Sequence, residues 1–341
     1  MNVIDLCERG YIPDALARFG MRRLIAQRLA EESAGDASAR YRALVDELRQ
    51  GPVAVHTDAA NAQHYEVPAE FFRLHLGPRL KYSSGLYGSG ATTLAQAEDA
   101  MLEACVQRAA VADGMRILDL GCGWGSLSLW LASRFPNAQV VGLSNSQGQR
   151  TFIEQRAAER GLPNLRIYTG NVVDFEFPAG EGPFDRVLSI EMFEHMRNYQ
   201  SLLAKVARWL KPGGKLFVHI FAHRRLAYPF EVRDGSDWMS QHFFTGGLMP
   251  SAALLGEFQQ DLKLRERWWV DGTHYQRTAN HWLDGMDANR GPIMAVFREA
   301  YGAQAELWFQ RWRMFYMAVA ELFGYGGGSE WGVAHHLFDK P

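Results

Sequence analysis

The stretch RILDLGCGWG, Arg116–Gly125, decides the fold, because a short buried strand runs there directly into a glycine-rich turn. Apolar residues at helical spacing follow over residues 126–135. Glycines let the backbone turn tightly and approach a ligand, and the start of a helix offers unpaired N–H groups to an anionic group. The stretch predicts a nucleotide-like ligand, although its GxGxG spacing differs from the GxGxxG dinucleotide motif.

Two further apolar strands follow the glycine-rich turn. Gln139–Leu143 comes after one helix, and a third strand, Arg186–Ile190, ends directly at Glu191. Strands that alternate with helices are typical of an α/β fold with a doubly wound, parallel sheet, which binds ligands at the carboxyl ends of its strands. We therefore expect Asp119, the loop after Leu143 and the acidic cluster at Glu191 to share one rim of the sheet.

The rest of the chain is organised around this sheet. Broken helical spacing over residues 5–49 predicts two or three helices, and a strand at 215–221 follows a Pro-Gly-Gly turn. Further strands are expected at 262–270 and 331–338. We expect three regions: a helical amino-terminal region with an irregular aromatic segment at 1–112, a Rossmann-like core at 113–223, and inserted cap helices with closing strands at 224–341.

One aromatic segment has two readings. ELWFQRWRMFYMAVAELF, residues 306–323, repeats its aromatic and aliphatic residues at helical spacing and interrupts them with charges. A packed core or cap helix accounts for this stripe better than a helix lying on a membrane surface, because any packed helix shows such a stripe.

Composition sets limits on partners and location. The chain has 341 residues, 47% of them hydrophobic, and a formal net charge of -2. The net charge gives no reason to expect nucleic-acid binding, although this charge is compatible with a local basic patch. No signal sequence and no apolar membrane span is evident, which predicts a cytoplasmic protein. Cys7, Cys105 and Cys122 form neither a disulfide framework nor a zinc ribbon.

The segment SIEMFEHMRNY concentrates ionisable groups at the end of a buried strand. If a helical turn begins at Glu191, then Glu191, Glu194 and His195 share one side and face the ligand rim. The alternative is an ordinary helix start with acids in its first turn and a histidine in the core. His219 and His223 could add to a metal site, but the second Glu-x-x-His pair of a di-iron site is missing, and we predict no metal.

These motifs together resemble a known family. ILDLGCGWG, VVGLSNSQGQR, FDRVLSIEMFEHMRNY and LKPGGKLFVH are similar to S-adenosylmethionine-dependent methyltransferases of the cyclopropane fatty acid synthase type. From about residue 64 onward, YEVP, TTLAQAE, DWMSQHFFTGG, HYQRT and AELFGYGGGSEW resemble the coclaurine N-methyltransferase branch of that family. The resemblance implies a class I methyltransferase fold that binds S-adenosylmethionine and releases S-adenosylhomocysteine.

The resemblance also implies roles for particular residues. Glycines of the turn would pass under the methionine part of the cofactor, the YSSG segment would cover it, and neutral polar residues would contact the ribose and adenine. The implied cofactor-binding residues are Tyr82, Ser83, Asp119, Gly121, Gly123, Ser144, Asn145, Gln149, Asn171 and Val172.

Two branches of the family differ at the acidic cluster. Cyclopropane synthases usually carry glycine where Glu191 stands, and they bind bicarbonate partly through a cysteine at the position of Ser84. His219, Glu194 and Tyr275 still match the bicarbonate-binding pattern. The amine methyltransferases instead resemble this chain in Glu191, in the Glu194 and His195 pair, and in Glu66.

The first hypothesis is therefore an N-methyltransferase of a small aromatic or hydrophobic amine. An alkylamine is largely protonated near neutral pH, so a carboxylate or imidazole must accept its proton. The candidates for this chemistry are Glu191, Glu194, His195 and Glu66, and those for substrate binding are Glu66, His219, His223 and Tyr275.

The alternatives are a lipid-modifying enzyme that adds carbon to an unsaturated acyl chain and a cofactor-binding scaffold without activity. The expected partner is an amine or a lipid rather than nucleic acid, and the sequence is compatible with a homodimer.

Overall fold

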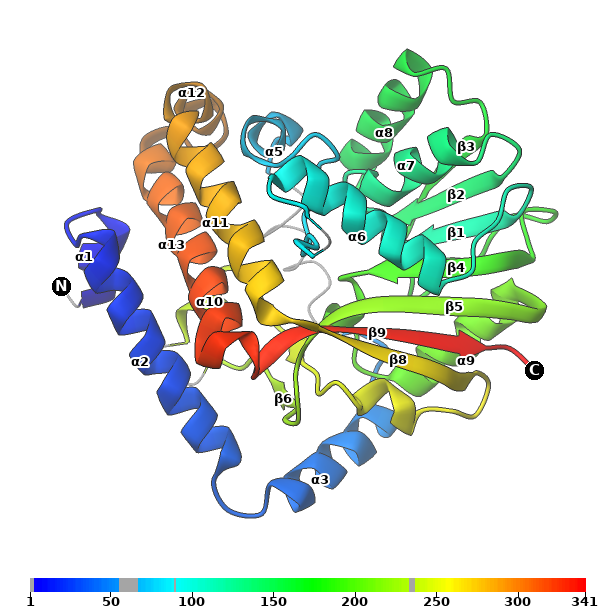
Figure 1. Ribbon diagram of the computed structural model, residues 1–341, viewed down its shortest axis with the longest axis horizontal. Helices are drawn as coiled ribbons and strands as arrows, with labels where there is room; N and C mark the ends of the chain where they lie inside the picture. The colour runs from blue at the N-terminus through cyan, green and yellow to red at the C-terminus, as the bar shows by residue number, and fades with distance from the viewer. Residues whose placement is uncertain (1–2, 55–66, 89, 233–236) are drawn as a thin grey trace.

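A seven-stranded sheet forms the centre of the computed structural model, which describes residues 3–54, 67–88, 90–232 and 237–341 (Figure 1). The strand order is β3-β2-β1-β4-β5-β9-β8; neighbours from β3 to β5 are parallel, and β9 is antiparallel to both β5 and β8. The strands are β1 (Arg116–Leu120), β2 (Gln139–Ser144), β3 (Leu165–Thr169), β4 (Phe184–Ile190), β5 (Leu210–His223), β8 (Lys263–Asp271) and β9 (Trp331–Asp339).

Both faces of the sheet are covered, which explains why its central strands are almost continuously apolar. Ile117 and Leu118 are neighbours on β1 and are both fully buried, but they belong to two different core clusters, because successive strand residues point to opposite faces. One face carries α6 (Leu94–Arg108), α7 (Ser126–Arg134) and α8 (Gln147–Glu159), and the other carries α3 (Ala37–Gln50) and α9 (Tyr199–Trp209).

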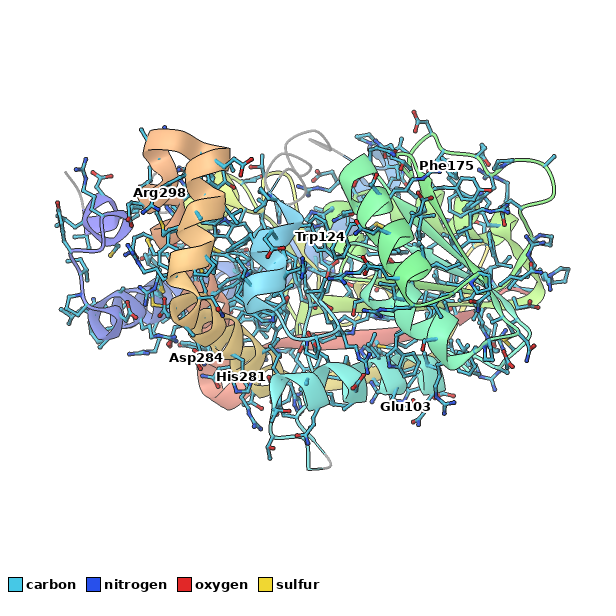
Figure 2. All side chains as sticks on the ribbon, turned by 90° about the horizontal axis from the view of Figure 1, so that it is seen from above. Glu103, Trp124, Phe175, His281, Asp284 and Arg298 are labelled. Atoms are coloured by element: carbon cyan, nitrogen blue, oxygen red, sulfur yellow. The ribbon has the colours of Figure 1, made fainter. Side chains whose placement is uncertain are left out.

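A helical layer stands beside the carboxyl ends of the parallel strands (Figure 1). Trp124 lies between the two parts in Figure 2, with Asp284 and Arg298 of the helical layer on one side and Phe175 on the other. The layer contains α1 (Val3–Glu8), α2 (Asp14–Ser33), α5 (Ala69–His75), α11 (Gly272–Ala288), α12 (Arg290–Tyr301) and α13 (Ala305–Gly324). A small ribbon of β6 (Tyr228–Pro229) and β7 (Leu248–Met249) and the short helix α10 (Trp238–His242) follow β5.

Ion pairs join the amino-terminal helices to α13. Glu321 accepts from Arg18 at 2.9 Å and from Arg22 at 2.7 Å, so one largely buried carboxylate ties α13 to two successive turns of α2. Arg313 bridges Asp14 of α2 and Asp287 of α11. Charge thus holds α2 on the helical layer together with its apolar contacts.

The structure agrees with most expectations for the elements and corrects two of them. The α/β class, the doubly wound sheet and the closing strands are confirmed, and α13 is a packed helix whose Trp312, Phe315 and Tyr316 are buried. The strand at Arg186–Ile190 is the fourth rather than the third, because β3 precedes it. Strand β3 carries the half-buried sequence LRIYT at the edge of the sheet and lacks the apolar run of its neighbours.

The second correction concerns the acidic cluster. No helical turn begins at Glu191: this residue has a left-handed backbone, with φ +48°, and a single 3-10 turn follows at Phe193–His195. The side chains of the cluster therefore do not follow α-helical spacing. Among the described helices, none is both long and apolar enough to cross a membrane.

Candidate active site

A pocket opens at the carboxyl ends of β1, β2 and β4. Seven of the ten residues expected to hold a cofactor line it, and His195 joins them from the 3-10 turn. The seven are Gly121, Gly123, Ser144, Asn145, Gln149, Asn171 and Val172.

The glycine-rich turn leaves space for a ligand at one defined position. Gly121, Gly123 and Gly125 all have positive φ, between +51° and +83°, a region that side chains disfavour. A Cβ on Gly121 would collide with Met192 and one on Gly125 with Ile153, whereas a Cβ on Gly123 would meet no atom within 4 Å. Because Gly123 lines the pocket, that open space belongs to the ligand site.

Neutral polar groups of the pocket are ready for a ligand. The Ser144 hydroxyl donates to Gln149 Oε1 at 2.6 Å and accepts from the Ser146 N–H at 3.0 Å. Gln149 Nε2 is buried and has no acceptor among the described residues. A buried amide donor without a partner is costly, so a bound ligand with hydroxyl or carboxylate oxygens fits this place.

The remaining three cofactor candidates lie next to the pocket instead of lining it. The carboxylate of Asp119 accepts from the Ser128 hydroxyl at 2.6 Å and so ties β1 to α7, and burial raises the pKa of Asp119 to about 7. The Tyr82 ring packs against Trp282 and Phe72. Ser83 accepts from the buried Lys81 ammonium at 2.5 Å.

Glu191 is the centre of the site. Its Oε1 accepts from the Ser84 N–H at 3.2 Å and from His219 Nε2 at 3.1 Å, and its Oε2 accepts from the Tyr275 hydroxyl at 2.6 Å. Burial raises the pKa of Glu191 to about 7, although the Lys81 charge and the hydrogen bonds from Tyr275 and Ser84 act in the opposite direction.

A chain of hydrogen bonds connects Glu191 to Arg108. Arg108 approaches His335 Nδ1 at 2.5 Å, His335 Nε2 approaches His219 Nδ1 at 2.9 Å, and His219 Nε2 approaches Glu191. A guanidinium can only donate, so Nδ1 of His335 is an acceptor and its Nε2 carries the hydrogen; the same reasoning places the hydrogen of His219 on Nε2. Both rings are neutral, because burial lowers their pKa well below the usual value.

Cys105, His219 and His335 lie close enough together for their ligand atoms to surround a metal ion, within 4.8 Å of one another. The two histidines instead bind each other, because His335 Nε2 and His219 Nδ1 lie 2.9 Å apart and share a hydrogen bond. Burial also raises the pKa of the Cys105 thiol to about 11, which disfavours the thiolate that a metal prefers. The arrangement favours a hydrogen-bonded chain with fixed tautomers over a metal site.

Glu194 and His195 leave the 3-10 turn in different directions. Glu194 is fully buried, and its Oε1 accepts from the Phe221 N–H of β5 at 2.8 Å, while its Oε2 has no partner among the described residues. Burial and the nearby charge of Glu191 raise the pKa of Glu194 well above its usual value. His195 lines the cofactor pocket and stacks on Phe244, with ring centroids 5.9 Å apart.

The two other substrate candidates have different outcomes. His223 is buried, and its Nδ1 accepts from the N–H groups of Arg225 and Leu226 at 3.0 and 2.8 Å, so this nitrogen supports the turn after β5. Glu66 lies outside the described residues. His335 and Arg108 were not among the sequence candidates, since nothing in their local sequence marks them.

The comparisons with known proteins agree with this geometry. The model of the mycolic acid cyclopropane synthetase family matches residues 55–326. The chain belongs to this family. Among its relatives, (S)-coclaurine N-methyltransferase of Thalictrum flavum subsp. glaucum is 35% identical over 100% of the chain and 96% of its own length. Cyclopropane-fatty-acyl-phospholipid synthase of Escherichia coli (strain K12) is 29% identical over 65% of the chain and 55% of its own length.

A solved structure matches nearly the whole chain. The crystal structure of coclaurine N-methyltransferase bound to N-methylheliamine and S-adenosylhomocysteine covers 99% of both chains with a TM-score of 0.94 and 34% identity. This member of the family is therefore an S-adenosylmethionine-dependent methyltransferase, as the sequence motifs implied, and its sheet is the class I methyltransferase sheet.

Gly123→Ala tests the cofactor pocket of this methyltransferase. The added methyl group enters the open space at φ +51° and should weaken S-adenosylhomocysteine binding at least tenfold, about 1.4 kcal/mol. Gly161→Ala is the matched control, since Gly161 also has positive φ, at +63°, and open space, but lies after α8 and outside the pocket. Calorimetry that finds equal affinity in both variants would contradict the assignment.

Tyr275→Phe tests the hydrogen bond that lowers the pKa of Glu191. Without it that pKa rises, so the acidic limb of the pH–rate profile should move to higher pH. Turnover at pH 7 should fall by about tenfold and recover in alkaline buffer. Tyr301→Phe, in α12, is the control. An acidic limb that stays in place, with turnover reduced equally at every pH, would assign Tyr275 a structural role only.

Proposed function

We propose that the enzyme methylates the nitrogen of a small aromatic or hydrophobic amine. The observation that carries this proposal is the Glu191 carboxylate, which is held by three donors beside the cofactor pocket and has a pKa of about 7. A group with this pKa is well suited to accept a proton near neutral pH. The names of the N-methyltransferases that the chain resembles point in the same direction.

A second cavity of about 500 Å³ supplies space for the acceptor. Its wall is largely apolar and includes residues of α1, α2 and α13. Tyr275 and Phe221 line it, and the Tyr275 hydroxyl and the Phe221 N–H donate to Glu191 and Glu194, so each carboxyl group lies one residue behind the wall. A cavity of this size with few polar groups suits a small molecule with an apolar body and one cationic group.

The His195 and Phe244 pair stands between the two cavities. His195 lines the cofactor pocket, Phe244 lines the acceptor cavity, and their rings are stacked nearly parallel, at 7°. The position of this pair therefore supports methyl transfer from the cofactor pocket to the acceptor cavity. S-adenosylmethionine supplies an electrophilic methyl group when it is bound.

The two carboxyl groups take different parts in the proposed mechanism. Glu191 exchanges a proton near pH 7 and removes the proton that masks the lone pair of the amine. Glu194, whose pKa is raised well above its usual value, favours its protonated form and lies behind Phe221. Aromatic walls exclude water and attract the cationic form of the amine.

Acyl-chain chemistry with bicarbonate fits less well. His219 and Tyr275, which by resemblance would hold bicarbonate, both donate to Glu191, and so does the backbone of Ser84. The enzyme's own carboxylate thus occupies the donors that an added carboxylate would need. Acyl-chain methylation, by analogy with the lipid synthase relative, remains the second candidate function, because His219, Glu194 and Tyr275 are all present.

Glu191→Gly separates the chemical role of Glu191 from its backbone strain. Turnover should fall by roughly two to four orders of magnitude, and formate should restore part of it by binding to the vacated donors. Ala110→Gly is the matched control, since Ala110 also has positive φ, at +51°, and is exposed. Full activity of the Glu191 variant would remove Glu191 from the mechanism, and a loss that no small carboxylate reverses would argue against its role as the base.

A labelled methyl donor distinguishes the acceptor classes. Incubation with parallel sets of hydrophobic amines and unsaturated phospholipid vesicles should label an amine, at a rate independent of added bicarbonate. Label in acyl chains that depends on bicarbonate would select the lipid alternative instead. Cofactor binding without transfer to any acceptor would favour the scaffold. The cytoplasmic location, the homodimer, the three regions and the role of Glu66 stay predictions from the sequence.

A further inference from the structure

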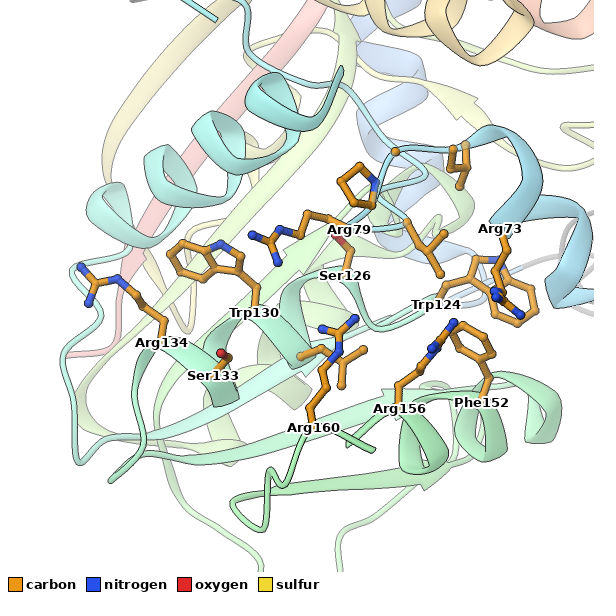
Figure 3. Close-up of a pocket in the computed structure, with 15 residues that line it drawn as sticks. Arg73, Arg79, Trp124, Ser126, Trp130, Ser133, Arg134, Phe152, Arg156 and Arg160 are labelled. Atoms are coloured by element: carbon orange, nitrogen blue, oxygen red, sulfur yellow. The ribbon is translucent and has the colours of Figure 1, made fainter. Parts of the chain in front are cut away.

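A third cavity, which is polar, lies on the outer side of the glycine-rich turn. It has a volume of about 400 Å³ and is bounded by α7, α8 and the segment 73–80 (Figure 3). Five arginines line it: Arg73, Arg79, Arg134, Arg156 and Arg160. Figure 3 shows Arg156 and Arg160 reaching up from α8 and its end, and Arg73 and Arg79 coming from the opposite side. No carboxylate lines the cavity among the residues that the structure describes.

Positive charge exceeds negative charge around this arginine cavity. Arg73 pairs with Glu70, Arg79 with Asp99 and Arg156 with Glu159, all through carboxylates that are well exposed to solvent. Such exposed pairs are weak and leave a guanidinium free to take another partner.

Two of the five arginines have no such ion pair. Arg134 and Arg160 make no ion pair with any carboxylate of the described chain. Burial and the like charges of Arg156 and Arg79 lower the pKa of Arg160, and the Glu159 carboxylate offsets them only in part. A bound anion would relieve this repulsion.

An independent observation places another donor there. Ser126 lines the arginine cavity, and its hydroxyl is buried without a partner among the described residues. Ser126 begins α7, a helix of nine residues, whose first N–H groups carry partial positive charge. The cavity thus adds a buried hydroxyl to its guanidinium groups.

The walls of the arginine cavity are also aromatic. Trp124, Trp130 and Phe152 line it, and Trp124 meets Phe152 edge-on at 5.5 Å between centroids. Arginine guanidinium groups bind phosphate through paired hydrogen bonds, and aromatic rings bind a planar group. The combination fits a ligand with a phosphate at one end and a ring at the other.

We propose that the arginine cavity binds a small phosphate ester that carries an aromatic or heterocyclic ring, of the size of a nucleoside monophosphate. The site is distinct from the cofactor pocket, with which it shares no lining residue. A volume of about 400 Å³ suits such a molecule. The proposal does not depend on the identity of the methyl acceptor.

The test is a titration of protein saturated with S-adenosylhomocysteine, so that the cofactor pocket is filled. The probes are adenosine monophosphate, inorganic phosphate, adenosine, and vesicles of phosphatidylglycerol. We expect saturable binding of adenosine monophosphate that is at least about tenfold tighter than that of phosphate or adenosine alone. This result would require both the charged and the aromatic walls.

Two double variants locate the binding. Arg156→Ala with Arg160→Ala should weaken adenosine monophosphate at least tenfold, whereas Arg42→Ala with Arg298→Ala, two exposed arginines of α3 and α12, should leave it unchanged. Arg134→Ala alone serves if the first double variant does not fold. Equal losses in both double variants, no saturation of the unmodified protein, or binding of vesicles without binding of adenosine monophosphate would each overturn the proposal.

Discussion

The active site depends on one buried carboxylate that gathers donors from distant parts of the chain. Glu191 at the end of β4 is bound by Ser84 from the segment before α6, by His219 from β5 and by Tyr275 from α11. These contacts join the sheet to the helical layer beside the cofactor pocket. Burying a charge is costly unless it is hydrogen-bonded, so the buried Glu191 carboxylate depends on all three donors.

Energy is stored at this same residue. A non-glycine residue at φ +48° is strained, at a cost of order 1 kcal/mol, and such strain is usually kept where function requires it. The His219, His335 and Arg108 chain fixes the tautomer of each ring, so a donor always faces the carboxylate. Rigid donors of this kind hold the Glu191 carboxylate in one place.

Local sequence patterns predicted the strands of the sheet better than they predicted the hydrogen-bond network around Glu191. Apolar runs predicted β1, β2, β4 and β5, but β3 was missed because Arg166 and Tyr168 make it half polar at the sheet edge. Spacing predicts a helical turn or an ordinary helix start at Glu191, because spacing alone does not reveal a left-handed residue. His335 joins the Glu191 network, and the five arginines join one cavity, only through tertiary folding, since they carry no motif and the arginines come from α5, the segment after α5, α7, and α8 with its end.

Two helices that line the acceptor cavity precede the part of the chain that the family model matches. Residues of α1 and α2 line the cavity, yet the match to the family begins at residue 55, after both helices. Strands β1 to β5 and β8, the glycine-rich turn and Glu191 all lie within the matched part, and β9 follows it. A change in α1 or α2 would thus reshape the acceptor cavity and leave every residue that lines the cofactor pocket in place.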